Sequence, residues 1–233
     1  MEALLDERNR PLWDQLNTKF ILTALPSSNE EYSVFSIDDV HTIRYVETNL
    51  CTASFTHELL HVYIRFHECF IGRCLMNTVA GSRLLSKIMS DNLLDHIGNC
   101  LDHIKMLPIY LDMGYERENF LLDYETHKCD PEELLLIEQY YRNNKKEIIP
   151  MVADGYIGRF FSMIADPNPA FDYSREMDRL RKVDPLLFQI NMNMIEQWKQ
   201  TPLENATIHS NYRTVISDYY ASLKIWLSKN KFT

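Results

Sequence analysis

Basic charge is scarce in this sequence. Its 24 Lys and Arg residues are outnumbered by 33 Asp and Glu residues, which gives a formal net charge of −9. Surfaces that bind nucleic acid or anionic membranes need basic patches. The locally basic stretches, Arg142 to Lys146 and Arg175 to Lys182, are interleaved with acids or Asn, which is typical of a solvated helix face. We therefore expect no nucleic-acid partner and no membrane partner.

Long apolar runs are also missing. No stretch reaches the ~18 uninterrupted apolar residues that a membrane-spanning helix needs. The first residues, Met-Glu-Ala-Leu-Leu-Asp-Glu-Arg, carry acids where a signal peptide is basic, and they have no continuous apolar core. These features predict a cytoplasmic protein.

Cysteine occurs in a pattern that does not suggest disulfides. There are five cysteines, an odd number, and none are in Cys-x-x-Cys spacing. This usage fits a reducing compartment better than a disulfide framework. Cys51 and Cys100 are candidate metal ligands, but buried small apolar residues are the preferred interpretation for both.

The length and apolar patterning predict one mainly helical domain. The 233 residues, 45% of them hydrophobic, can bury a sizeable core. Val, Ile, Tyr and Phe concentrate at Tyr32–Ile37 and His41–Val46 around an Asp-Asp pair, which predicts a β-hairpin. The fold class is thus α+β, with a small hairpin or sheet before the helix described next. The expected parts of this single domain 1–233 are an N-terminal helical segment 1–25, a hairpin 32–46, helices over 52–107, and a helical remainder 116–229.

Apolar periodicity and proline positions divide the helical parts further. The first helix after the hairpin is expected to be capped by Thr52 or Ser54 and to run to about Thr78. The other expected helices cover 82–90, 91–107, 116–126, 131–149, 151–165, 173–199 and 207–229.

The most informative motif is Phe-Thr-His-Glu-Leu-Leu-His-Val at residues 55–62. His57 and His61 are four residues apart, so on a helix their imidazoles lie one turn apart and can bind one ion. Glu58 lies beside them and can accept a proton from a water on that ion. The flanking residues are mostly apolar, as a buried helix requires. The pattern predicts a Zn²⁺ site with His57 and His61 as ligands and Glu58 as general base.

A third ligand is expected on the helix that begins at Asp91. His96 and His103, seven residues apart, share one edge of this helix, whereas Asp95 is nearer to solvent. His96 is the preferred third ligand, with Asp95 and Asp91 as alternatives. His103 is a candidate to stabilise a reaction oxyanion, as are Tyr110 and Tyr115.

His67 resembles a further ligand but is rejected. A terminal histidine six residues after His61 requires a glycine at position 64 so that the chain can turn out of the helix. That position is Ile64, and a β-branched residue strongly disfavours the positive φ of such a turn.

Residues 55–62 resemble the zincin metallopeptidases, whose helix carries the same His-Glu-x-x-His motif. The preceding hairpin and the following helices are similar to the general plan of that class. The match is firm only over His57, Glu58 and His61. The gluzincin third-ligand pattern, Asn-Glu-x-x-x-Asp, is not found, because Asn92 is followed by Leu93.

These observations predict a zinc metallopeptidase that hydrolyses a protein or peptide substrate, which the hairpin could bind by strand addition. A regulatory protein partner is a further candidate. The alternative from another class is a non-catalytic, partner-binding helical protein with a retained or relic zinc site. A small-molecule hydrolase that uses the same ion is a third possibility. The sequence does not distinguish substrates or oligomeric states.

Overall fold

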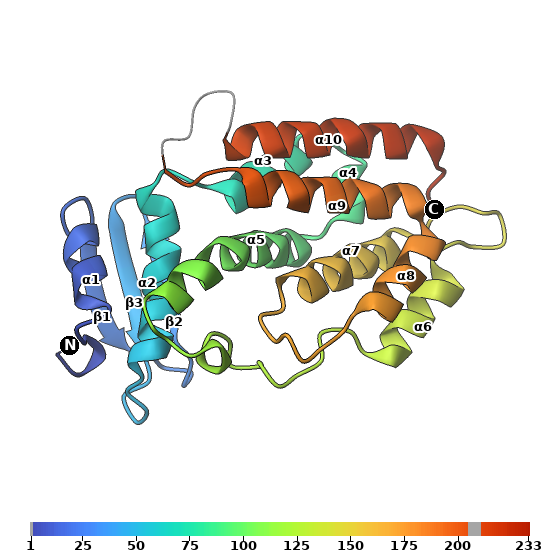
Figure 1. The fold of residues 1–233 in the computed structure, drawn as a ribbon. Helices are drawn as coiled ribbons and strands as arrows, with labels where there is room; N and C mark the ends of the chain where they lie inside the picture. Colours follow the sequence, from blue (N-terminus) through green and yellow to red (C-terminus); the bar gives the residue numbers. More distant parts are fainter. Residues whose placement is uncertain (1, 205–210) are drawn as a thin grey trace. The chain divides into compact units, whose positions relative to one another are not determined.

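The computed structural model describes residues 2–204 and 211–233, and most of them are helical (Figure 1). One small mixed sheet precedes helix α2, which confirms the predicted α+β class. The chain packs as two compact units. The first unit comprises Met1–Cys69 and Ile104–Tyr124, and the second comprises Phe70–His103 and Glu125–Thr233. The expectation of a single domain stays a prediction.

The sheet of the first unit has three strands in the order β1-β3-β2. The predicted hairpin is present: β2 (Ser33–Ile37) and β3 (Val40–Tyr45) are antiparallel. They are joined by Asp38-Asp39, and Asp38 adopts φ 48°, a left-handed conformation that Asp tolerates in tight turns. Strand β1 (Ile21–Pro26) pairs with β3 in parallel, which leaves β1 and β2 as the edges.

The N-terminal segment is only partly helical. Its helices are η1 (Glu2–Leu4) and α1 (Arg10–Leu16), which has Pro11 in its first turn. The expectation that helix continues to residue 25 is wrong, because residues 21–25 belong to β1. The backbone pairing with β3 overrides the helical spacing of the apolar residues there.

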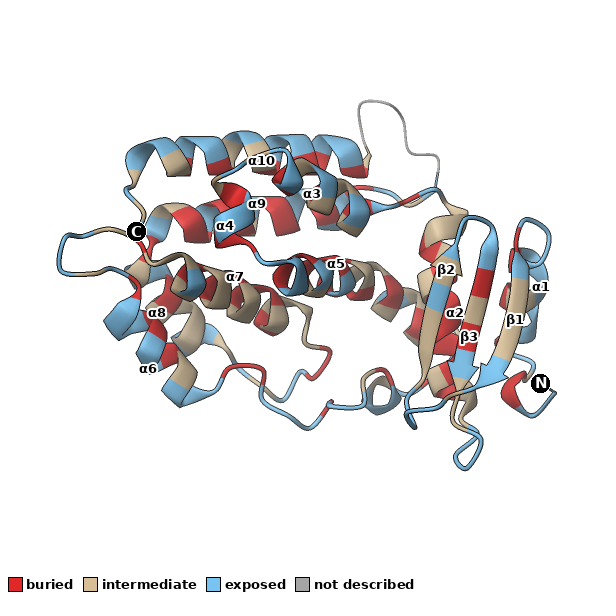
Figure 2. Ribbon diagram, turned by 180° about the vertical axis from the view of Figure 1, so that it is seen from behind, coloured by how far each residue is buried: buried red, intermediate tan, exposed pale blue. Residues whose placement is uncertain are grey.

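Helices α1 and α2 cover one face of the sheet. Figure 2 shows both helices behind the sheet, and along β3 buried His41 and Ile43 alternate with less buried positions, including exposed Val40 and Arg44. This alternation is the period-two pattern of a half-buried strand. Helix α2 therefore packs against the buried face of this sheet.

Helix α2 (Thr52–Phe66) is shorter than expected. Its N-cap is Cys51, whose sulfur accepts the backbone N–H of Ser54 at 3.5 Å, rather than Thr52 or Ser54. The helix ends at Phe66, since Glu68 adopts φ 56° and turns the chain before α3 (Ile71–Ala80). The continuous helix to Thr78 is thus wrong, because a non-glycine left-handed residue interrupts it.

The second unit consists of helices, with the first part of α5 among them. The helices that follow α3 are α4 (Leu85–Ile88), α5 (Asp91–Asp112), α6 (Pro131–Tyr140), α7 (Pro150–Ala165), α8 (Ser174–Val183), α9 (Pro185–Gln200) and α10 (Tyr212–Lys229). Helix α5 continues through Pro108 into the first unit.

Several predicted helix boundaries are corrected. Residues 116–126 form turns with a short 3-10 helix, η2 (Arg117–Asn119), instead of an α-helix. The helix expected to reach 149 ends at Tyr140, and the helix expected over 173–199 is split at Asp184. Residues 207–210 of the last predicted helix lie outside the described residues.

Asp184 holds several helices of the second unit together. It is 4% exposed and caps α9 by accepting the Leu187 N–H at 2.9 Å. Its other carboxylate oxygen accepts hydrogen bonds from the Tyr141 hydroxyl and the Trp226 indole, each at 2.9 Å. These donors offset the cost of burying a carboxylate.

Candidate metal centre

Helix α2 presents three polar side chains from one turn. His57 and Glu58 are buried at 8% and 9% exposure, and His61 is half-buried. The ring centroids of His57 and His61 lie 5.1 Å apart, so the two imidazoles are neighbours on the helix surface as predicted. Because apolar residues fill the rest of the helix turn, these polar groups are held in a site with little access to water.

A third histidine completes this group. The ligand nitrogens of His57, His61 and His103 all lie within 4.8 Å of one another, and His103 is buried. His103 is supplied by α5 and directly precedes the residue at which this helix enters the first unit. Neutral imidazole is a ligand for zinc, copper, iron and nickel. The three side chains can therefore hold a metal ion, and their chemistry alone does not select zinc.

The three ligand nitrogens are close enough together to hold a metal ion. Nitrogen ligands ~2.05 Å from a tetrahedral Zn²⁺ are about 3.3 Å apart. The ligand atoms of the three histidines all lie within 4.8 Å of one another, so they would have to move closer together to reach this spacing around an ion. Three protein ligands leave a fourth position of a tetrahedral ion open, which is the arrangement of catalytic rather than structural zinc sites.

The predicted third ligand, His96, does not belong to this histidine group, whereas His103 does. His96 lies seven residues earlier on α5, about 10.5 Å along the axis at 1.5 Å per residue, so the two cannot bind one ion on a straight helix. Its Nε2 is instead 2.8 Å from the Ser162 hydroxyl, and burial lowers its pKa, with the Gly158 carbonyl opposing and the Arg159 charge adding to the shift. The alternatives Asp91 and Asp95 are exposed and do not belong to the histidine group.

Glu58 sits in an environment that favours a neutral carboxyl. Burial raises its pKa, and the charge of His61 and the backbone N–H of Val34 offset only part of this rise. The contribution of Val34 places strand β2 beside the Glu58 carboxyl group. A carboxylate with a raised pKa is a stronger base, which suits a group that accepts and returns a proton near neutral pH.

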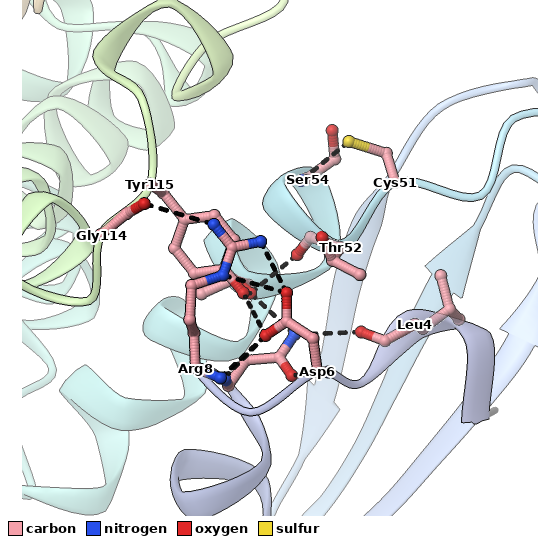
Figure 3. A network of polar contacts seen from close by, with 10 residues as sticks. Leu4, Asp6, Arg8, Cys51, Thr52, Ser54, Gly114 and Tyr115 are labelled. Atoms are coloured by element: carbon pink, nitrogen blue, oxygen red, sulfur yellow. Dashed lines mark hydrogen bonds and ion pairs between the residues drawn. The ribbon is translucent and has the colours of Figure 1, made fainter.

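The two tyrosines considered as oxyanion donors are placed differently. The Tyr115 hydroxyl donates to Asp6 at 3.2 Å and lies 2.9 Å from the Thr56 hydroxyl, in a network with the N-terminal segment (Figure 3). The Tyr115 hydroxyl is therefore engaged in hydrogen bonds that hold the N-terminal segment. The Tyr110 hydroxyl is fully buried and has no hydrogen-bond partner among the described residues.

Two further residues beside the cluster, Phe120 and Val34, are not indicated by the sequence. The Phe120 ring lies 4.8 Å from the His57 ring, edge to face, and packs against Tyr110 at 5.1 Å. Phe120 follows η2 in a segment that was expected to be helical, and no sequence motif marks it. Val34 acts through its backbone, which no side-chain pattern can indicate.

The fold and this group of residues define a mainly helical α+β protein with a three-histidine, one-glutamate cluster. Searches for similar proteins found no match among family models, curated proteins or solved structures. None of the described helices is long and apolar enough to cross a membrane.

Proposed function

We propose that this protein is a zinc-dependent peptidase in which His57, His61 and His103 hold the ion and Glu58 is the general base. The proposal rests on one observation: His103, which belongs to a different helix, lies beside the His57 and His61 pair that the motif predicted. Three imidazoles with an adjacent buried carboxylate form the ligand and base set that metal-assisted hydrolysis requires.

A bound zinc ion would supply Lewis acidity, polarising the substrate carbonyl and lowering the pKa of water to ~7. The three histidines fix its position. Glu58 takes a proton from the attacking water and donates it to the leaving amine, and its raised pKa matches both steps. Burial of His57 and Glu58 excludes bulk water that would compete for this proton.

Strand β2 supports a peptide as the substrate class. It is an edge of the sheet, so one row of its backbone groups is not paired with another strand. Helix α2, which carries Glu58, packs against this strand, and the backbone N–H of Val34 offsets part of the rise in the Glu58 pKa. An extended peptide that pairs with an edge strand would present its backbone carbonyls next to Glu58.

Glu58→Gln tests the proposal. We expect the variant to retain zinc, measured by mass spectrometry of the metal, and to lose on the order of 10²–10⁴-fold in cleavage of a proteome-derived peptide library, as removal of a general base does. The matched control is Glu47→Gln, which changes an exposed acid of the same unit and should leave cleavage unchanged.

The outcomes separate the candidate functions. Undiminished cleavage by the Glu58→Gln variant would remove the role assigned to this residue. Zinc binding by the wild type without cleavage of any library peptide would favour a partner-binding protein with a zinc site. Absence of zinc from protein purified and reloaded with the metal would remove the site itself.

A further inference from the structure

A second candidate site lies in the helical unit, on α3 and the start of α10, which pack against each other. These two elements line a surface cavity of about 430 Å³. Its lining residues are Phe70, Arg73, Cys74, Asn77, Thr78, Tyr212 and Arg213. Pockets for small molecules have volumes of about 300–1,000 Å³, so the cavity has the size of a small organic ligand.

Two exposed arginines, Arg73 and Arg213, line this cavity. Within residues 2–204 and 211–233, no carboxylate forms an ion pair with Arg73 or Arg213. This occurs in a protein whose acids outnumber its bases by 33 to 24. Two guanidinium groups that line one cavity create a positive potential there, which favours the binding of an anion.

A contact with a neighbouring ring restricts the position of the Arg213 side chain. Its guanidinium lies 4.8 Å from the centroid of the buried Tyr212 ring, a cation-π contact that restricts its movement. Burial raises the pKa of the Cys74 thiol on α3, and a hydrogen bond with Thr78 and the charge of Arg213 counteract part of this rise. Arg213 also belongs to the first turn of an 18-residue helix, where the helix dipole adds positive potential.

The remaining lining residues indicate what else the ligand carries. Phe70 is 42% exposed and offers an aromatic ring at the edge of the cavity. Asn77, one turn from Arg73 on α3, offers an amide for a further hydrogen bond. A planar guanidinium fork matches the oxygens of a phosphate or a carboxylate.

We propose that this cavity binds a small organic anion whose phosphate or carboxylate group is held between Arg73 and Arg213, with an apolar or aromatic part against Phe70. The site is independent of the histidine cluster, because every residue that lines it belongs to the second unit. Loss of zinc or of Glu58 should leave it intact.

Titration of the full chain with phenyl phosphate, benzoate and uncharged benzamide tests the proposal. Binding would be followed by NMR in phosphate-free buffer at constant ionic strength. We expect saturable binding of at least one anion and none of benzamide. Arg73→Gln and Arg213→Gln should each weaken binding by on the order of 10–100-fold, the equivalent of a charged hydrogen bond. Arg83→Gln, which changes an exposed arginine of the same unit outside the cavity, should have no effect.

Each outcome decides the question. Tighter binding of phenyl phosphate identifies a phosphate site, and tighter binding of benzoate identifies a carboxylate site. The proposal is overturned if neither anion binds saturably, if benzamide binds equally well, or if the Arg73→Gln/Arg213→Gln double variant binds as the wild type does.

Discussion

At the scale of residues, whether a histidine of α5 joins the cluster depends on its position along the helix axis. His96 and His103 lie on the same edge of α5 and carry the same side chain. The sequence pattern therefore does not distinguish which of them joins the cluster. The structure brings His103 to His57 and His61, and it places His96 against Ser162. Two turns of helix thus separate a candidate ligand from a structural histidine.

Substitution of the two histidines provides a matched comparison. We expect His103→Gln to lose zinc on dialysis, because it removes one of three ligands, and His96→Gln to retain it. Metal content by mass spectrometry checks this, and circular dichroism shows whether each variant folds. Zinc loss in the His96 variant alone would restore the ligand predicted from the sequence and reject His103.

Asp6 is a residue whose stabilising effect depends on pH. Its pKa is lowered to about 2: burial raises it, but hydrogen bonds from Arg8 and Asn9, together with the Arg8 charge, outweigh burial. A lowered carboxyl pKa stabilises the fold above the unfolded value of 3.8, and this stability is lost as the pH falls towards 2. Asp6→Asn should therefore reduce the free energy of unfolding by ~1 kcal/mol at pH 7.

Chemical denaturation at several pH values measures this effect. The difference in unfolding free energy between wild type and Asp6→Asn should shrink between pH 4 and pH 2. Asp14→Asn changes an exposed acid of α1 and should show no such trend. A constant difference across this range would mean that the ionised form of Asp6 is not what stabilises the N-terminal segment.

At the scale of elements, the crossing of α3 and α5 in the second unit depends on two glycines. A Cβ atom added at Gly98 would lie 3.0 Å from the Cα of Gly72, which is tighter than most contacts that real Cβ atoms make. The two helices pack this closely only because neither residue has a side chain. The crossing fixes the segment of α5 that lies between His96 and His103.

Gly98→Ala should reduce the free energy of unfolding by about 1–3 kcal/mol, the usual cost of overpacking. Gly155→Ala on α7 is the matched control, because nothing lies within 4 Å of its added Cβ. That change should stabilise the protein by ~0.5–1 kcal/mol through helix propensity alone. Urea denaturation measures both. Equal effects of the two substitutions would show that the helices can separate without cost.

Element boundaries show where local patterns were sufficient. The β2–β3 hairpin was predicted because both strands and their Asp-Asp turn are adjacent in sequence. Strand β1 was not, since its pairing with β3 joins residues about twenty positions apart. Helix α2 ends early because Glu68 adopts a left-handed conformation. A glutamate gives no sign of this conformation in the sequence.

At the scale of the whole molecule, metal binding should stabilise the folded chain by mass action. Zinc at a hundred times its dissociation constant contributes ~2.7 kcal/mol. For a chain of this size, each kcal/mol shifts the melting temperature by roughly 2–4 °C. A chelator should therefore lower the melting temperature of the zinc-loaded protein by about 5–10 °C.

Differential scanning calorimetry with and without chelator measures this shift. His61→Gln serves as the control, because a variant without the site should melt at the same temperature under both conditions. A wild-type melting temperature that does not respond to the chelator, or an equal response in the variant, would contradict a zinc site built from this histidine.

The sequence by itself determined the mainly helical α+β class and the juxtaposition of His57, Glu58 and His61. Both follow from periodicities within one segment, where helix or strand geometry fixes which side chains are neighbours. Only the tertiary structure decided that His103 rather than His96 joins the pair, that β2 runs beside Glu58, and that Arg73 and Arg213 share a cavity. These facts depend on how elements distant in the chain pack together, and packing is set by the complementary shapes of many side chains at once.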